Sequence, residues 1–126
     1  MSRHPDADAV LDATALDQAL QTMPHWRLHD GHLRRHYRTA GWKSTMMVVG
    51  TIGHLAEAAW HHPDLSVTYA EVIVKLVTHS AGGITAKDVA LARQIEAVIG
   101  WQPGRDPDSP LEGTPDDPRL RHLKYD

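Results

Sequence analysis

The pattern of apolar residues along the chain predicts three helices. Apolar side chains recur every three or four positions in residues 14–22, 42–60 and 85–99. Pro24 follows the first segment as a stop signal, and Gly100 ends the third. We therefore expect two shorter helices at either side of one long central helix.

Polar residues at two of these starts are suited to capping a helix. Thr14 and Thr85 each have an aspartate three positions further on, which is the spacing of a capping box. In the long segment, Gly50 and Gly53 each weaken the helix by about 1 kcal/mol relative to alanine. We expect another element to approach the helix backbone closely at these two glycines.

Alternating residues predict a hairpin in residues 26–37. Asp30 and Gly31 form a favoured type I′ turn pair. A two-residue loop at this position pairs His29 with His32, and it places the larger apolar side chains of both strands on one face.

A second strand region covers residues 66–78, which are rich in β-branched side chains. Its length suggests two short strands with a break near Ala70 and Glu71. The order of elements is then helix, strand, strand, helix, strand, strand, helix. This order predicts an α+β fold in which a four-stranded antiparallel sheet has helices packed on one face.

The composition changes after residue 100. Five of the eight prolines lie at or beyond Pro103, so residues 103–118 are not expected to form regular structure. We expect one domain over residues 1–100 and a Pro/Asp-rich C-terminal extension over residues 101–126. The apolar residues expected to anchor this extension are Leu120, Leu123 and Tyr125.

Composition and charge exclude several classes of protein. The chain has 126 residues with 41% hydrophobic and 23% charged residues, which is typical of a single globular domain. It has no cysteine, no apolar run long enough for a membrane span and a polar N-terminus, so we expect a cytoplasmic protein without disulfides. The formal charge of −3 gives no general attraction to nucleic acid or to anionic membranes.

The most unusual feature of the composition is the presence of ten histidines. His61 and His62 are adjacent where the long helix passes into a loop, and His79 lies where a strand ends. Asp88 lies in the first turn of the next helix, within reach of the loop that carries His79. A carboxylate in such a position can hold an imidazole in one tautomer.

Three interpretations of these histidines compete. His61 and His62 could simply bind the last carbonyls of the helix. His54, Glu57 and His61 lie at helical intervals and could hold zinc. The third interpretation is acid/base catalysis, in which one imidazole protonates a leaving hydroxyl while another group removes a proton. Nucleophilic catalysis is disfavoured because the chain has no Gly-x-Ser-x-Gly motif.

The spacing of the chemically distinctive residues resembles the signature of the pterin-4a-carbinolamine dehydratases. The positions that match are Glu57, His61, His62, Pro63, Tyr69, His79 and Asp88. The resemblance covers residues 11–100, and Trp26 lies where the family has a tryptophan before its first strand. The chain departs from the family at Thr39, where an aromatic residue is usual, and in its C-terminal extension.

The resemblance implies a dehydratase that uses histidines to remove water from 4a-hydroxytetrahydrobiopterin, giving quinonoid dihydropterin. His61 and His79 would be the acid/base pair, His62 would bind and polarise the pterin ring, and Asp88 would orient His79. The three histidines would converge on one pocket. The residues implied to contact the substrate are Trp26, which would wall the pocket, and Glu57, Trp60, Pro63, Thr78 and Ser80.

The resemblance also implies partners. It implies a homodimer or homotetramer, with no metal and no organic cofactor, and it leaves residues 101–126 as a candidate segment for binding another protein. Some proteins of this fold act without catalysis, as a partner of a transcription factor or as a Rubisco assembly factor. Turnover of the carbinolamine would distinguish the enzyme from such an interaction protein.

Overall fold

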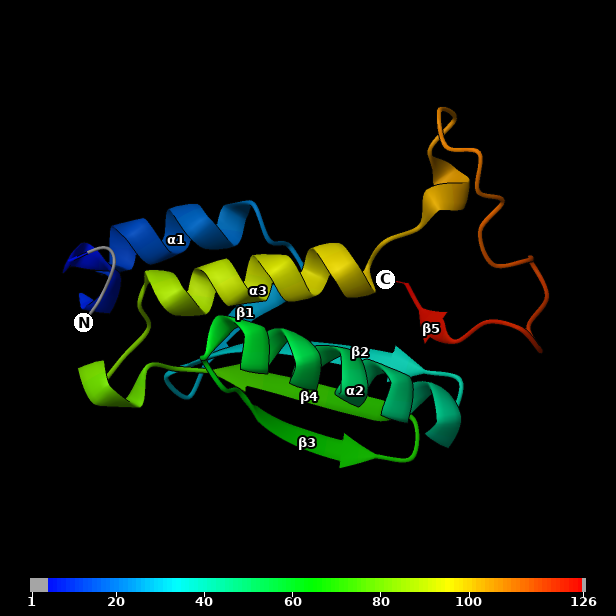
Figure 1. Ribbon diagram of the computed structural model, residues 1–126. Coiled ribbons are helices and arrows are strands. Elements are labelled where there is room, and N and C mark those ends of the chain that lie inside the picture. The colour runs from blue at the N-terminus through cyan, green and yellow to red at the C-terminus, as the bar shows by residue number, and fades with distance from the viewer. Residues whose placement is uncertain (1–4, 126) are drawn as a thin grey trace.

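The chain forms an antiparallel sheet with its helices on one face (Figure 1). The computed structural model describes residues 5–125, so residues 1–4 of the expected domain and residue 126 of the expected extension lie outside the described residues. The helices are α1 (Ala13–Gln21), α2 (Trp42–Ala59) and α3 (Ala86–Ile99), and the 3-10 turns are η1 (Pro5–Asp8), η2 (His79–Ala81) and η3 (Pro103–Arg105). The strands are β1 (Trp26–His29), β2 (His32–Thr39), β3 (Asp64–Thr68), β4 (Glu71–Leu76) and β5 (Leu123–Lys124). No helix within the described part of the chain has the length and apolarity to cross a bilayer.

The sheet has the order β1-β2-β4-β3, and β5 pairs with β2. The predicted hairpin and the predicted pair of short strands are both confirmed. In the first, Asp30 and Gly31 have φ values of 50° and 74°, and His29 pairs with His32. In the second, β3 and β4 pair on either side of a turn next to Glu71. The predicted α+β class with helices on one face is also confirmed, and the extension adds the fifth strand.

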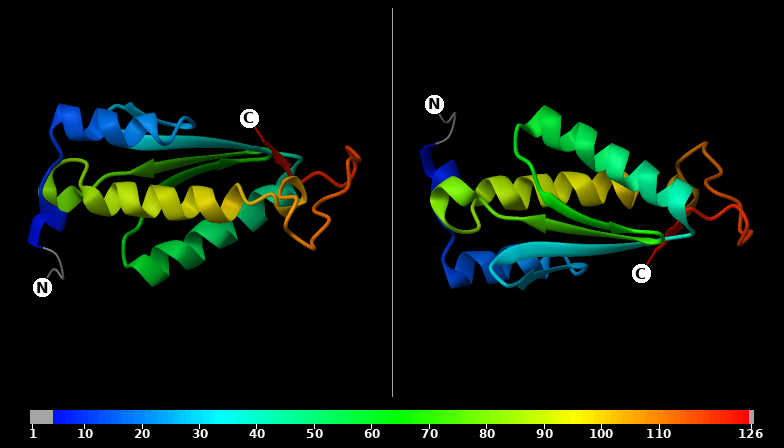
Figure 2. Two further views of the ribbon diagram at one scale, coloured as in Figure 1. Left: turned by 90° about the horizontal axis from the view of Figure 1, so that it is seen from above. Right: turned by 90° about the horizontal axis from the view of Figure 1, so that it is seen from below.

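The core lies between the sheet and the three helices. Seen from above, α3 lies between α1 and α2 (Figure 2). Alternate residues of β2 and β4 point at the helices, and Leu33, Val72, Val74 and Leu76 have no exposed surface. Ile52 of α2 and Ile95 of α3 are also fully buried. Burying each such side chain stabilises the fold by roughly 1.5–3 kcal/mol, which fixes the helices on the sheet.

The starts of α1 and α3 are set by side-chain caps. Thr85 caps α3 in the predicted capping box. The predicted cap of α1 at Thr14 is wrong, because Asp12 accepts a hydrogen bond from the backbone N–H of Ala15 at 2.8 Å and α1 begins at Ala13. At the other end of α2, Trp60 adopts a left-handed conformation with φ 51°. This residue turns the chain out of the helix and directs His61 toward α3.

The glycines of α2 lie on an open surface of the described chain. A Cβ atom added at Gly50 or Gly53 would meet nothing within 4 Å, so the expected close approach of another element does not occur within this chain. The same helix exposes Trp42, Met46 and Met47 by 53%, 43% and 52%. This part of α2 is therefore an uncovered apolar surface with two glycines beside it.

Thr39, at the position where an aromatic residue is usual, forms a buried hydrogen bond. Its hydroxyl lies 2.7 Å from the hydroxyl of Thr45, which in turn donates to the carbonyl of Tyr69 at 2.9 Å. Both threonine side chains are almost completely buried. The substitution therefore links the end of β2, the start of α2 and the β3–β4 turn through polar contacts.

The C-terminal extension returns to the sheet. Leu123 pairs with Thr39 and is 6% exposed within the core, whereas Leu120 and Tyr125 are 54% and 38% exposed. Of the three expected anchors, Leu123 is the one that enters the core. Between its start after α3 and β5, the extension encloses an open groove of about 1670 Å³ against α2 and the end of α3.

Candidate active site

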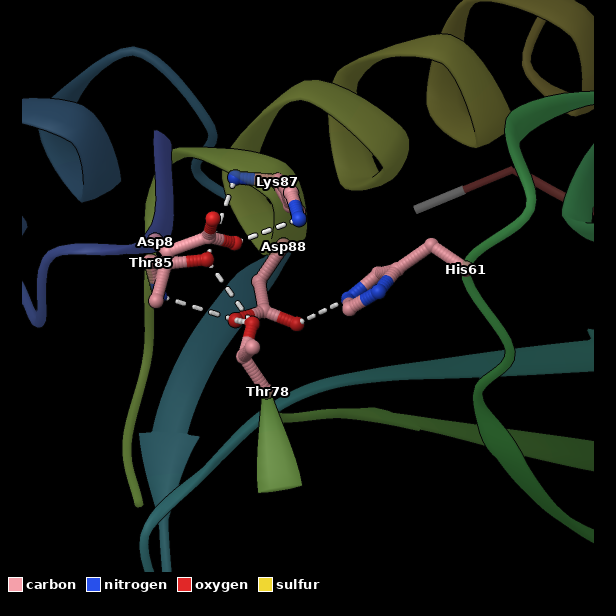
Figure 3. A network of polar contacts seen from close by, with 6 residues as sticks. All are labelled: Asp8, His61, Thr78, Thr85, Lys87 and Asp88. Carbon is pink, nitrogen blue, oxygen red and sulfur yellow. Dashed lines mark hydrogen bonds and ion pairs between the residues drawn. The ribbon is translucent and has the colours of Figure 1, made fainter. Parts of the chain in front are cut away.

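Asp88 lies at the centre of a buried polar network at the start of α3 (Figure 3). Its side chain has no exposed surface. Oδ2 accepts hydrogen bonds from the hydroxyl of Thr78 at 2.7 Å and from the backbone N–H of Thr85 at 2.8 Å. Oδ1 lies 2.7 Å from Nε2 of His61. The carboxylate that completes the capping box therefore also holds an imidazole.

His61 reaches this carboxylate from the end of α2. The left-handed Trp60 ends the helix, and the backbone N–H of His61 still donates to the carbonyl of Ala56 at 3.1 Å. The His61 side chain is 15% exposed, so part of it remains accessible while Nε2 is bound to Asp88. A partly exposed imidazole held by a buried carboxylate is suited to proton transfer.

His62 forms a second, exposed pair at the same end of α2. Its Nε2 lies 2.7 Å from Oε1 of Glu57, and the two side chains are 49% and 69% exposed. The ring of Trp60 meets the His62 ring edge-to-face with centroids 5.1 Å apart. Trp60 itself is 76% exposed, and Pro63 follows directly before β3. Glu57, Trp60 and His62 thus form one exposed cluster beside His61 in the sequence.

His79 begins η2, and both His79 and Ser80 are exposed. The expectation that Asp88 orients His79 is wrong, because Asp88 binds His61 instead. The physical reason is that Thr78, just after β4, donates its hydroxyl proton to Asp88. His79 follows as the first residue of η2, and its side chain is exposed. Within residues 5–125, the His79 side chain forms no hydrogen bond or ion pair.

Thr78 has a different role from the one expected. Its side chain is 4% exposed, and its hydroxyl contacts both Asp88 and Thr85, the latter at 2.8 Å. Its carbonyl accepts backbone hydrogen bonds from Ala81 and Gly82 at 3.0 Å each. The groups of Thr78 that were expected to meet a substrate are therefore used to hold the network and the η2 turn.

Trp26 belongs to another cluster, on the opposite side of α3 from α2. It is 3% exposed, and its Nε1 donates to Oε1 of Glu96 at 2.8 Å. Arg35 donates to both carboxylate oxygens of Glu96, and Tyr37 donates to Oε1 at 3.1 Å. In this position Trp26 offers almost no surface to a ligand, in contrast to its expected role as a wall of the substrate pocket.

The charges in this second cluster shift two pKa values. Burial would raise the pKa of Glu96, but the hydrogen bonds and charge of Arg35, aided by Trp26 and Tyr37, lower it below its usual value. Burial raises the pKa of Tyr37, and the neighbouring carboxylate of Glu96 raises it further. Glu96 is therefore ionised and Tyr37 neutral at physiological pH.

Neither of these clusters has the arrangement of a metal centre. No group of three or more His, Asp or Glu side chains in the described part of the chain is placed to hold a metal ion. The candidate ligands His61 and Glu57 contact Asp88 and His62, respectively. The groove beneath the extension is lined by none of the three histidines.

Thr85 is the member of the site that the sequence did not single out as functional. It was recognised as a helix cap, and its spacing to Asp88 was the available signal. A carboxylate at the third position of a capping box accepts the backbone N–H of the cap through one oxygen, which leaves the other oxygen for a different partner. Here that partner is His61.

Comparisons with known proteins agree with the resemblance noted in the sequence. The sequence profile of a family described as pterin 4 alpha carbinolamine dehydratase matches residues 9–98. A protein of Aquifex aeolicus, whose name as a pterin-4-alpha-carbinolamine dehydratase is provisional, is 40% identical over 71% of this chain and 90% of its own. A protein of Mycolicibacterium vanbaalenii with the same provisional name is 40% identical over 73% of this chain and 99% of its own.

A solved structure shows the same fold. The crystal structure of a transcriptional coactivator/pterin dehydratase from Brucella melitensis superposes with a TM-score of 0.67 at 26% identity, covering 71% of this chain and 97% of that chain. The profile match ends at residue 98, so the C-terminal extension lies outside it.

Proposed function

Because the chain belongs to the pterin 4 alpha carbinolamine dehydratase family, we propose that it dehydrates 4a-hydroxytetrahydrobiopterin to quinonoid dihydropterin by acid/base catalysis. The reaction breaks the bond from C4a to its hydroxyl group, which leaves as water after gaining a proton. A proton is lost from the adjacent ring nitrogen as the new double bond forms. Two positioned groups in different protonation states suffice for these transfers.

The observation that carries this proposal is the pair formed by His61 and the fully buried Asp88. This pairing fixes one nitrogen of an imidazole that is still partly exposed. His61 is therefore the first acid/base group, and His79, whose ring is exposed and unpaired within residues 5–125, is the second. His62, Glu57 and Trp60 form the exposed cluster that we assign, together with Pro63 and Ser80, to holding the pterin ring.

The proposal is tested by following absorbance during dehydration of freshly generated 4a-hydroxytetrahydropterin. Wild-type protein should accelerate the reaction, and the double variant His61→Ala/His79→Ala should approach the rate in buffer. The matched control is His36→Ala, since His36 lies on the sheet and pairs with Glu71. A wild-type rate equal to that of buffer would exclude the dehydratase function.

A second copy of the chain is the partner that α2 fits best. The exposed side chains of Trp42, Met46 and Met47 lie on the same helix as the open glycines Gly50 and Gly53. Two such helices can cross closely at glycines and bury the apolar side chains against each other. Sedimentation should show a homodimer or homotetramer that Met46→Glu weakens and that Arg27→Glu, at an exposed position of β1, does not. Equal masses for all three proteins would exclude this interface.

A non-catalytic role is the second candidate, favoured by the groove between α2 and the extension and by the exposed Trp101, Leu111 and Leu120 beside it. Exposed apolar residues around a groove are typical of a surface that binds another protein. If wild-type protein binds pterin but does not turn it over, this interaction role replaces catalysis as the function of the chain.

A further inference from the structure

The hydrogen bonds around Asp88 have only one possible set of directions. An ionised carboxylate accepts hydrogen bonds and cannot donate them. Oδ2 of Asp88 accepts two hydrogen bonds, one from the hydroxyl of Thr78 and one from the backbone N–H of Thr85. The hydroxyl of Thr78 must therefore donate its proton to Oδ2, which leaves only its lone pairs for another partner.

That partner is the hydroxyl of Thr85, at 2.8 Å. Since the proton of Thr78 is used by Asp88, Thr85 must donate to Thr78. The lone pairs of Thr85 in turn accept from the backbone N–H of Lys87 at 3.3 Å. Protons therefore point in one direction along this chain of groups, from Lys87 through Thr85 and Thr78 to Asp88.

The same reasoning fixes the imidazole on the other side of Asp88. The group facing Oδ1 is Nε2 of His61 at 2.7 Å, and because the carboxylate can only accept, Nε2 must carry the proton that is shared between them. In the neutral ring, Nδ1 then carries the lone pair. Within residues 5–125, Nδ1 of His61 has no hydrogen-bond partner, and it belongs to the edge of the ring that does not face Asp88.

We propose that Nδ1 of His61 is the atom that exchanges a proton with the substrate, and that Thr85 and Thr78 are positioning residues that hold His61 in this tautomer through Asp88. The inference rests on the proposed function for its catalytic part. It adds an atomic assignment for His61 and a role for Thr85 beyond capping α3. Thr78 acts here on Asp88 and not on the pterin.

The geometry gives a sharp consequence for Asp88→Asn. Thr78 and the backbone N–H of Thr85 both donate to the position of Oδ2, so the amide oxygen of asparagine must occupy that position. The amide NH₂ group then faces Nε2 of His61, which has to accept a hydrogen bond. The proton of the neutral ring moves to Nδ1, and the atom proposed to receive a proton from the substrate loses its lone pair.

Long-range ¹H–¹⁵N correlation spectra of the free protein test this assignment, recorded at alkaline pH where imidazoles are neutral. We expect His61 to be protonated at Nε2 in the wild type and at Nδ1 in Asp88→Asn. His62, which pairs with Glu57, is the internal control and should keep one tautomer in both proteins. A wild-type His61 protonated at Nδ1, or an unchanged tautomer in Asp88→Asn, would overturn the proposal.

Kinetics separate positioning from structural support. Thr78→Val and Thr85→Val should lower kcat by about tenfold with KM nearly unchanged, and Thr78→Ser and Thr85→Ser should restore most of it. Loss of the cap at Thr85 lowers the melting temperature whichever role Thr85 has. The value of kcat per folded molecule separates the two roles, because a purely structural role would leave it unchanged. Such an unchanged kcat in both valine variants would overturn the positioning role.

The spectra and the kinetics fail independently. The spectra require no substrate, so they apply to the wild type and Asp88→Asn even if a valine variant does not fold. An Nε2–H tautomer without turnover would reject the proposed function and keep the hydrogen-bond chain. Turnover with an Nδ1–H tautomer would reject the inference and keep the proposed function.

Discussion

Trp26 and Glu96 are separated by 70 positions in the sequence, and the indole N–H of one donates to the carboxylate of the other at 2.8 Å. The contact joins the first strand to the last helix across the core. Arg35, whose side chain is 8% exposed, contributes the compensating charge. Trp26, Arg35 and Tyr37 are buried and Glu96 is 26% exposed, so this cluster places an ion pair at the edge of the core.

We predict that Glu96→Gln lowers the free energy of unfolding by about 2 kcal/mol near neutral pH, because it removes the negative charge that Glu96 places against the buried Arg35. The lowered pKa of Glu96 means that its contribution is present above the ordinary carboxyl pKa of 4.5 and is lost as the pH falls through the lower folded-state value. The difference between variant and wild type should therefore shrink toward pH 3 or so in urea unfolding. Glu71→Gln, in an exposed pair with His36, is the control, and a pH-independent difference would contradict this account.

His61→Ala and His79→Ala should each lower kcat by at least about tenfold, because each removes a positioned proton-transfer group that water replaces only in part. Steady-state kinetics on the carbinolamine measure this effect, with circular dichroism to confirm folding. Equal kcat values in the wild type and His79→Ala would remove His79 from the mechanism and leave His61 as its only assigned imidazole.

His62→Ala and Glu57→Gln should raise KM more than they lower kcat, since we assign this exposed pair to holding the pterin ring. Both substitutions should leave the free energy of unfolding almost unchanged, because the two side chains are 49% and 69% exposed. A variant that lost kcat at unchanged KM would instead place His62 among the proton-transfer groups.

Leu123→Ala should destabilise the protein by roughly 2 kcal/mol, whereas Leu120→Ala should change the free energy of unfolding by less than about 0.5 kcal/mol. The first side chain is 6% exposed within the core and the second is 54% exposed, although they lie three residues apart. Thermal unfolding of both variants, compared with a chain ending at Gly100, tests this. Equal stability of all three and the wild type would show that β5 contributes nothing to the fold.

The sequence predicted the hairpin turn at Asp30 and Gly31 and the cap at Thr85, because both depend on local backbone chemistry. It also predicted that His61 and Asp88 belong to one site. It assigned the wrong imidazole to Asp88, because the direction in which Trp60 turns the chain out of α2 is not visible in residue spacing. Which imidazole meets a carboxylate far along the chain depends on such turns.

Other features were outside the reach of local patterns. Side-chain type predicts all three anchors of the extension equally, whereas strand register decides that Leu123 enters the core opposite Thr39. Trp26 was placed at the site by family position, whereas its burial depends on Glu96, far along the chain. Nothing in the spacing of these residues encodes their contact.

Trp60 has a consequence that concerns the balance between stability and activity. A bulky residue with φ 51° is strained, because its Cβ crowds the backbone in the left-handed region, where glycine fits without penalty. Glycine would relieve this strain at the helix end, yet the chain has a 76% exposed indole there beside His62. Trp60→Gly should thus have a higher melting temperature and a weaker affinity for pterin than the wild type, because glycine relaxes the backbone and removes the indole ring.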